Sequence, residues 1–195
     1  MNVYDFDKTI FYPDSSEQFF LYCLKRFPGR VLPVLPRGVC LAIAYRLGKV
    51  EFPALKEQFF SFLPRIENLD AVVEEFWHKR MSGLQSWYLQ QKREDDLIIS
   101  ASPEFLLRPV ANALGVRLIA TVIDCQSGKI LGENCHDAAK LRRFNEQFPD
   151  DKIDEFYSDS LSDAPLAMAA ERAFLVKKDK LFDWPKKSTG GMREE

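Results

Sequence analysis

The sequence has no excess of positive charge. Its 27 Lys and Arg residues face 29 Asp and Glu residues, which gives a formal net charge of −2 at pH 7. Bulk charge therefore attracts the chain neither to a nucleic acid nor to an acidic membrane surface. We expect no nucleic-acid partner.

Closely spaced cysteines are also missing. Cys23, Cys40, Cys125 and Cys135 form no CxxC pair, and nothing ahead of the first apolar segment resembles a signal peptide. We therefore expect buried, reduced thiols in a cytoplasmic protein. Zinc is not expected, because the spacing of Cys125, Cys135 and His136 matches no zinc-binding pattern.

A hydrophobic run long enough to cross a bilayer is the third absence. Residues 31–47 are mostly apolar, but a helix of about 20 apolar residues cannot be drawn. The interrupting residues are Pro33, Pro36, Arg37, Gly38 and Arg46. We expect a buried helix here. The alternative is a segment that docks onto a membrane surface or holds an apolar substrate.

Short apolar segments do alternate with helix-like ones. The 195 residues are 46% hydrophobic and include 16 Phe, which is enough for a well-packed core. Segments of strand length lie at 2–6, 97–100, 116–123, 155–158 and 173–176, and helical segments at 103–114, 138–148 and 165–171. This alternation predicts an α/β fold, with a parallel sheet that helices cover on both faces. The stretch "DCQSGKILGENC" predicts an additional hairpin that turns at Ser127-Gly128.

Residues 13–93 break the alternation, because they have helical periodicity and contain no clear strand. They predict a helical domain inserted into a core made of residues 1–12 and 94–195. The polar, Gly-containing end "WPKKSTGGMREE" is expected to be a frayed tail.

Polar residues follow three of the predicted strands. Asp5 and Asp7 follow the first strand, Ser100 and Ser102 the second, and Asp159 and Asp163 the fourth. Residues two apart in a strand point to one face, and the carboxyl ends of parallel strands meet at one crevice. Lys140, early in a predicted helix, can reach the same crevice. These residues predict a shared site.

Four carboxylates in one crevice repel one another unless a cation is present. Oxygen ligands and a phosphate-binding environment suit Mg²⁺, which we expect as the cofactor, with Asp159 completing its ligand shell. Asp163 would orient a metal-bound water or Lys140.

This set of residues can transfer a phosphoryl group. We predict Asp5 as the nucleophile that forms an aspartyl-phosphate, and Asp7 as the general acid and base. Ser100 and Lys140 would bind the phosphoryl oxygens as negative charge develops.

Each residue also has a plain structural interpretation. Ser100 alone would be a helix N-cap, Lys140 a surface lysine, and Asp163 an N-cap ahead of Pro165. Their joint order on successive strand ends favours the shared site.

The same motifs resemble those of the haloacid dehalogenase-like (HAD) superfamily. "DFDKTI" resembles its DxDx[TV] first motif, with Thr9 at the hydroxyl position, and "LIISAS" resembles the second. Lys140 resembles the third motif and "YSDSLSD" the fourth. Asp7 is typical of the phosphatase and phosphotransferase branch. The helical insert and "GENCHDAAKLRRF" resemble subfamily IB, the phosphoserine-phosphatase-like group.

The resemblance implies a Rossmann-like core with a small, all-helical cap of the C1 type after the first strand. It implies Mg²⁺ bound by the carboxylates of Asp5 and Asp159 and by the backbone carbonyl of Asp7, with Asp163 beside them. The substrate phosphate would lie on Ser100, Ala101 and Lys140. The cap would close over a small phosphorylated substrate and exclude water.

The substrate-specificity positions depart from the phosphoserine phosphatases. Asp14 stands where those enzymes carry a cap glutamate, and their carboxylate-binding arginine would fall near Lys56 or Glu57. Without a bidentate guanidinium the carboxylate of phosphoserine would be held poorly. We therefore expect weak phosphoserine turnover by a Mg²⁺-dependent phosphatase.

Two alternatives concern the acceptor and the substrate. The segment "FPGRVLPVLPRGVCLAIAYRLGKV" is similar to the corresponding part of bacterial phosphatidylglycerophosphate phosphatases, which implies a lipid-phosphate phosphatase whose cap contacts the membrane. A phosphotransferase that passes the phosphoryl group to an alcohol is the second alternative, because the choice of acceptor depends on the geometry of the cap. A binding module without turnover would need a damaged motif, and the four motifs are intact.

Overall fold

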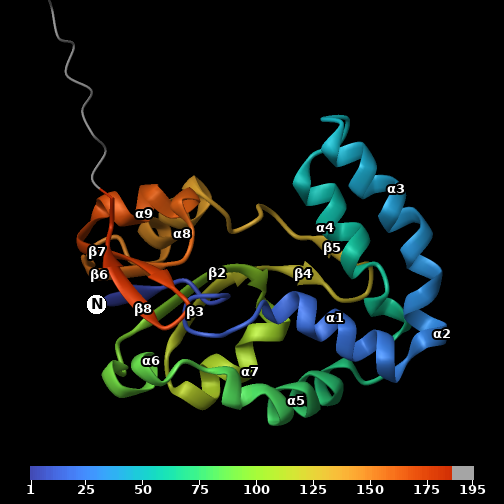
Figure 1. Cartoon of the computed structure of the whole chain (residues 1–195), viewed down its shortest axis with the longest axis horizontal. Coiled ribbons are helices and arrows are strands. Elements are labelled where there is room, and N and C mark those ends of the chain that lie inside the picture. The colour runs from blue at the N-terminus through green and yellow to red at the C-terminus, as the bar shows by residue number, and fades with distance from the viewer. Residues whose placement is uncertain (186–195) are drawn as a thin grey trace, which may run out of the picture.

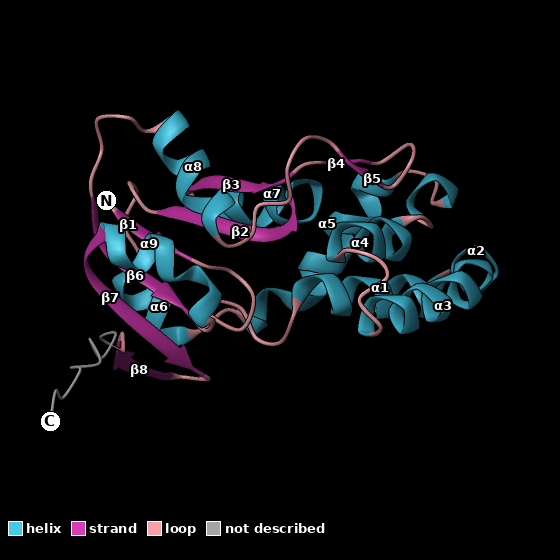
Figure 2. Cartoon of the chain, turned by 90° about the horizontal axis from the view of Figure 1, so that it is seen from above, coloured by secondary structure: helices cyan, strands magenta, loops and turns pink. Residues whose placement is uncertain are grey.

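A six-stranded sheet forms the centre of the molecule. The computed structural model describes residues 1–185, and residues 186–195 of the predicted frayed tail lie outside the described residues. The strand order is β3-β2-β1-β6-β7-β8, in which all strands except the antiparallel β8 run parallel. The strands are β1 Asn2–Tyr4, β2 Leu97–Pro103, β3 Arg117–Thr121, β6 Ile153–Ser158, β7 Ala170–Lys177 and β8 Lys180–Asp183. Figures 1 and 2 show this sheet on one side of the molecule.

Helices cover both faces of the sheet, as predicted. Side chains alternate along β2, so that Ile98 packs into one hydrophobic core while Leu97 and Ile99 pack into the other. The first core includes α7 Glu104–Leu114, and the second includes α8 Ala138–Gln147 and α9 Ala164–Ala169. The predicted α/β class is therefore confirmed.

Several element boundaries differ from the predicted ones. The first strand ends at Tyr4 rather than at residue 6, and the segment predicted as one strand at 116–123 divides into β3 and a short β4, Ile123–Asp124. β7 begins at Ala170 because it pairs with β6 from Ile153 onward, and this ends α9 before residue 171. β8 was not predicted, since all four of its residues are exposed and only its pairing with β7 makes it a strand.

The chain between β1 and β2 contains helices and no strand in its described residues, as predicted. Asp14 caps the first helix by accepting a hydrogen bond from the backbone N–H of Glu17. The helices are α1 Ser15–Arg26, α2 Pro28–Val31, α3 Leu35–Arg46, α4 Phe52–Phe60, α5 Leu69–Arg80 and α6 Ser86–Gln91, with short 3-10 turns between them.

The first hydrophobic core extends across residue 93, the predicted end of the insert. The Trp77 ring on α5 packs edge-on against Phe6, 5.8 Å between centroids, and its indole N–H donates to the carbonyl of Leu106 on α7. Tyr88 on α6 packs in the same way on Tyr4, at 4.8 Å. α5 and α6 thus cover the sheet directly, whereas α2, α3 and α4 lie farther out (Figure 1).

The prediction of a buried helix within 31–47 is wrong. α3 has no buried residue, and Val39, Ile43 and Leu47 are 59%, 55% and 64% exposed. The helix lies at the outer edge of the molecule beside α4, which covers only one side of it (Figures 1 and 2). No single described helix is long and apolar enough to span a membrane. α1 and residues 28–46 together have the length and apolar composition of a span, but the two are bent by 115° relative to each other.

The predicted hairpin is present and attaches the core to α4. β4 pairs antiparallel with β5, Lys129–Ile130, and Gly128 turns between them at φ +74°. Glu57 on α4 accepts a hydrogen bond from the backbone N–H of Ile130 at 3.0 Å. A Cβ atom at residue 128 would lie only 2.6 Å from the carbonyl oxygen of Phe60, so glycine is needed for this close approach.

We expect Gly128→Ala to lower the free energy of unfolding by about 1–3 kcal/mol more than Gly132→Ala. Gly132 is the matched control, because it also has a positive φ, +78°, but no atom lies within 4 Å of its Cβ position. Urea unfolding of both variants measures the difference. Equal losses would show that the contact with Phe60 contributes nothing.

Candidate active site

A cavity of about 450 Å³ lies where the carboxyl ends of β1, β2 and β6 meet the helices α1 and α4. The structure brings together every site residue that the sequence analysis named. All of them line this cavity: Asp5, Asp7, Asp14, Ser100, Ala101, Lys140, Asp159 and Asp163. The convergence expected for the ends of parallel strands is thus observed.

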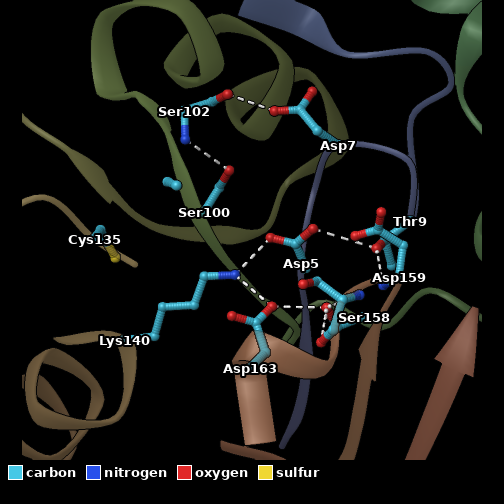
Figure 3. Close-up of polar contacts among 12 residues, drawn as sticks. Asp5, Asp7, Thr9, Ser100, Ser102, Cys135, Lys140, Ser158, Asp159 and Asp163 are labelled. Carbon is cyan, nitrogen blue, oxygen red and sulfur yellow. Dashed lines mark hydrogen bonds and ion pairs between the residues drawn. The ribbon is translucent and has the colours of Figure 1, made fainter. Parts of the chain in front are cut away.

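A buried lysine between two carboxylates is at the centre of the site (Figure 3). The Nζ atom of Lys140 lies 2.7 Å from Asp5 Oδ1 and 2.7 Å from Asp163 Oδ2. The hydroxyl of Ser158 also donates to Asp163 Oδ2, at 2.7 Å. Lys140 and Asp163 are each only 2% exposed, so water screens the charges of this cluster only weakly.

These contacts exclude the plain structural interpretations. Lys140 is buried rather than on the surface, and the Asp163 carboxylate makes no capping hydrogen bond to α9. Ser100 does not cap α7, whose N-cap residue is Pro103; its hydroxyl accepts from the backbone N–H of Ser102 at 3.0 Å. The pairing of β2 with β3 shifts register between Ser100 and Pro103, which turns this stretch along the cavity.

The ionisation of the central cluster follows from burial and charge. Burial raises the pKa of Asp5 to about 6, although the positive charge of Lys140 opposes the rise. Burial alone would lower the pKa of Lys140, but the charges of Asp5 and Asp163 raise it above its ordinary value. The lysine therefore stays protonated and holds Asp5 as a carboxylate.

Asp7 has different surroundings from Asp5. Its carboxylate accepts hydrogen bonds from the backbone N–H of Ser15 at 2.6 Å and from the hydroxyl of Ser102. Burial, together with the charge of Asp14, raises the pKa of Asp7 to about 7. Asp7 can thus carry a proton near neutral pH, as a general acid must. The sequence placed Ser102 at this strand end but gave no sign that it would bond to Asp7.

Thr9 connects the first and fourth motifs. Its hydroxyl donates to Asp5 Oδ2 at 3.3 Å and accepts from the backbone N–H of Asp159 at 2.9 Å. The side chain is fully buried. One hydroxyl thereby fixes the Asp5 carboxylate relative to the loop that carries Asp159 (Figure 3).

Comparison with known proteins agrees with this geometry. The family model of the haloacid dehalogenase-like hydrolases matches residues 3–168. The chain belongs to this family. The resemblance drawn from the four motifs is therefore confirmed, and the family supports the predicted enzyme class of phosphoric monoester hydrolases.

Individual relatives cover nearly the whole chain. Protein CicA of Caulobacter vibrioides is 30% identical over 192 residues, which cover 91% of this chain and 86% of CicA. A solved structure from Bordetella pertussis Tohama I, described as a protein of unknown function, has a TM-score of 0.71 and 26% identity, and covers 89% of this chain and 87% of its own. A phosphoserine phosphohydrolase-like protein from Francisella tularensis shares the fold, with a TM-score of 0.52 and 16% identity. The match covers 89% of this chain and 86% of the Francisella protein.

The four carboxylates of this HAD chain are divided among different partners. Asp163 binds Lys140, and Asp7 binds Ser15 and Ser102. The described residues contain no group of three or more His, Cys, Asp or Glu side chains that could hold a metal ion. The four carboxylates therefore do not form one cluster of ligands, and the expected metal set has only the carboxylates of Asp5 and Asp159 with the backbone carbonyl of Asp7.

A smaller set of oxygen donors does fit Mg²⁺. Asp5 and Asp159 both line the cavity and are tied together through Thr9. Burial raises the pKa of Asp159, with the charge of Lys8 opposing the rise, so its negative charge is only partly balanced. Two carboxylates, a backbone carbonyl and water satisfy a hard cation. The metal role of each residue stays a prediction.

The cap contributes two charged residues to the cavity. Asp14, besides capping α1, lies 3.6 Å from the ammonium of Lys8. Lys56 on α4 is only 9% exposed, and its Nζ donates to the carbonyl of Ala101 and to Asn134 Oδ1. Glu57 points instead to the hairpin. Lys56 is thus the residue of the pair that faces the cavity, which residue spacing alone did not decide.

Lys56 is a buried cation whose two hydrogen-bond partners are uncharged. Burial lowers its pKa to about 8, and the charges of Asp7 and Asp14 only partly oppose this. The charged form is therefore destabilised in the folded protein, and an anion entering the cavity would stabilise it.

We expect this burial to appear in the pH dependence of stability. Below pH 8 the folded protein bears the full destabilisation of charged Lys56, and this disappears as the pH rises from about 8 toward its ordinary pKa of 10.5. Compared with Lys56→Met, the wild type should therefore gain up to about 3 kcal/mol over that interval.

Urea unfolding at a series of pH values measures the difference in unfolding free energy between the wild type and Lys56→Met. Titrations that are common to both proteins cancel in this difference. Lys92→Met is the matched control for losing a lysine–carbonyl hydrogen bond, which Lys92 makes with Leu114. A difference that does not change with pH would contradict the assignment.

Proposed function

We propose that this HAD-family chain is a Mg²⁺-dependent phosphatase that hydrolyses phosphomonoesters through an aspartyl-phosphate on Asp5. The observation that carries the proposal is that two acids in one cavity have different partners, a buried cation for Asp5 and hydrogen-bond donors without charge for Asp7. Lys140 holds Asp5 as a carboxylate at 2.7 Å, while the pKa of Asp7 is raised to about 7. Such a pair combines a nucleophile with a proton donor.

In the first step an Asp5 carboxylate oxygen attacks the phosphorus atom. The new O–P bond forms as the bond from phosphorus to the ester oxygen breaks, and Asp7 donates its proton to the leaving alkoxide. Lys140 and the Ser100 hydroxyl, which both line the cavity, stabilise the phosphoryl oxygens. The product is an alcohol and a phosphorylated Asp5.

In the second step a water molecule attacks the same phosphorus atom. Asp7, now a carboxylate, removes a proton from that water, and the bond between Asp5 and phosphorus breaks to release inorganic phosphate. The hydrogen bonds from Ser15 and Ser102 keep the Asp7 carboxylate in place through both steps. Both residues return to their starting protonation states.

The cofactor assignment rests on the oxygen donors described above. The carboxylates of Asp5 and Asp159 and the backbone carbonyl of Asp7 would hold Mg²⁺. Bound there, it would supply positive charge that offsets the mutual repulsion of the carboxylates and the incoming phosphate.

We expect Asp5→Asn to lower Mg²⁺-dependent hydrolysis of p-nitrophenyl phosphate by about 10⁴-fold or more, because an amide cannot form the acyl-phosphate. Phosphate release gives kcat and KM directly. The exposed Asp95→Asn is the matched control and should keep the wild-type rate. Retention of activity in Asp5→Asn would exclude the mechanism.

The wall of the cavity favours substrates with an apolar leaving group. α4 lines it with Phe52, Leu55, Phe59 and Phe60. Lys56, a cap cation that lines the cavity, already donates to Ala101 and Asn134. Although the Francisella protein is named phosphoserine phosphohydrolase-like, no arginine is among the described residues that line this cavity, so none is offered to the carboxylate of phosphoserine. A lipid phosphomonoester is therefore the substrate class that we infer.

We expect kcat/KM for a short-chain phosphatidylglycerophosphate to exceed that for phosphoserine by about tenfold or more. Leu55→Ser should reduce this preference while leaving hydrolysis of the small p-nitrophenyl phosphate less affected, since it removes apolar contact and no catalytic group. Comparing kcat/KM for the three substrates measures the preference. More efficient turnover of phosphoserine would rule out the lipid assignment and leave the phosphatase mechanism standing.

A further inference from the structure

α3 presents an apolar stripe that nothing in the described structure covers. Val39, Ile43 and Leu47 follow one another at four-residue spacing, so they lie on one face of the helix, and each is more than half exposed. α3 is also the helix at the outer edge of the molecule, away from the sheet (Figure 2). A contiguous exposed apolar surface of this kind is typical of an interaction site.

The segment of sequence that contains the stripe carries charge of a single sign. Residues 18–50 contain no Asp or Glu, although the whole chain has a net charge of −2. The segment contains six basic residues: Lys25, Arg26, Arg30, Arg37, Arg46 and Lys49. Arg26 and Arg30 pair with Glu75 and Glu67.

The remaining basic residues near the stripe have no such partner. Arg37, Arg46 and Lys49 are exposed and take part in none of the ion pairs between described residues. Arg46 follows Ile43 by three residues, which places the two on adjoining parts of the helix surface. The helix and its C-terminal end therefore combine an apolar stripe, which Arg46 adjoins, with positive charge that no ion pair between described residues compensates.

We propose that this face of α3 docks onto the surface of an anionic phospholipid bilayer. Apolar side chains would enter the boundary between headgroups and acyl chains, while the basic residues would lie against the lipid phosphates. A second copy of the chain fits less well, because a twofold contact would bring the same positive face against itself. Charge complementarity thus favours the membrane over self-association.

The docking face adjoins the mouth of the cavity. The Tyr45 ring near the end of α3 lies 6.0 Å, between centroids, from the Phe52 ring at the start of α4. Phe52 is 45% exposed and also lines the cavity. A docked α3 would therefore bring the cavity close to the lipid surface. This connection to lipid substrates rests on the proposed function, whereas docking itself does not.

Vesicle flotation of the full chain tests docking. The wild-type protein should float with vesicles of equal parts phosphatidylcholine and phosphatidylglycerol. With vesicles of phosphatidylcholine alone, the amount of protein that floats should be at least about tenfold smaller. Val39→Glu combined with Ile43→Glu should reduce binding to the anionic vesicles by about tenfold or more. Raising the salt concentration should weaken wild-type binding.

Matched variants separate docking from folding and from catalysis. Met168→Glu combined with Leu181→Glu adds the same two charges at exposed apolar positions on α9 and β8, and should float like the wild type. Asp5→Asn should also float like the wild type, so a failed phosphatase mechanism leaves this result unchanged. Circular dichroism and p-nitrophenyl phosphate hydrolysis confirm that the α3 variant is folded.

Two results would overturn the proposal. One is flotation that is absent with anionic vesicles or equal for the wild type and the α3 double variant. The other is a concentration-dependent dimer, measured by sedimentation, which the α3 variant dissociates while vesicles bind neither protein.

Discussion

The rest of the site depends on the Lys140 ammonium, which is buried between the carboxylates of Asp5 and Asp163. A lone charge of either sign would be strongly destabilising at this depth, and the cluster is tolerable only because its members compensate one another. Each member comes from a different part of the chain: the end of β1, helix α8, and the turn before α9. The ion pairs therefore fix the positions of these three elements relative to the sheet as well as the ionisation of Asp5.

The second acid differs from the first because its neighbours differ. Asp5 lies next to a cation, whereas Asp7 lies next to Asp14 and two serines. Two carboxylates that are separated by one residue in sequence thus obtain different electrostatic surroundings in one cavity. Ser15 comes from the first turn of α1 and Ser102 from β2, so the helical insert itself takes part in positioning Asp7.

The helices of the insert differ in how deeply they are buried. α5 and α6 share the core of the sheet, and α4 is attached through Lys56, Glu57 and the close approach of Gly128. α3 packs against α4 but places no residue in either hydrophobic core, although its composition is apolar. The sequence suggested burial because hydrophobic residues are buried on average, but hydrophobicity does not state which partner covers a helix. In the tertiary structure only α4 packs against α3, and it covers one side of the helix.

The sequence by itself determined the fold class, the family motifs and the residues of the site, because strand ends of a parallel sheet converge wherever the alternation of segments is correct. The motifs "DFDKTI", "LIISAS" and "YSDSLSD" were enough to name these residues. Only the tertiary structure decided which carboxylate pairs with Lys140, that Ser102 bonds to Asp7, and that Lys56 rather than Glu57 faces the cavity. These contacts join residues many positions apart, and their geometry follows from packing, which residue spacing does not encode.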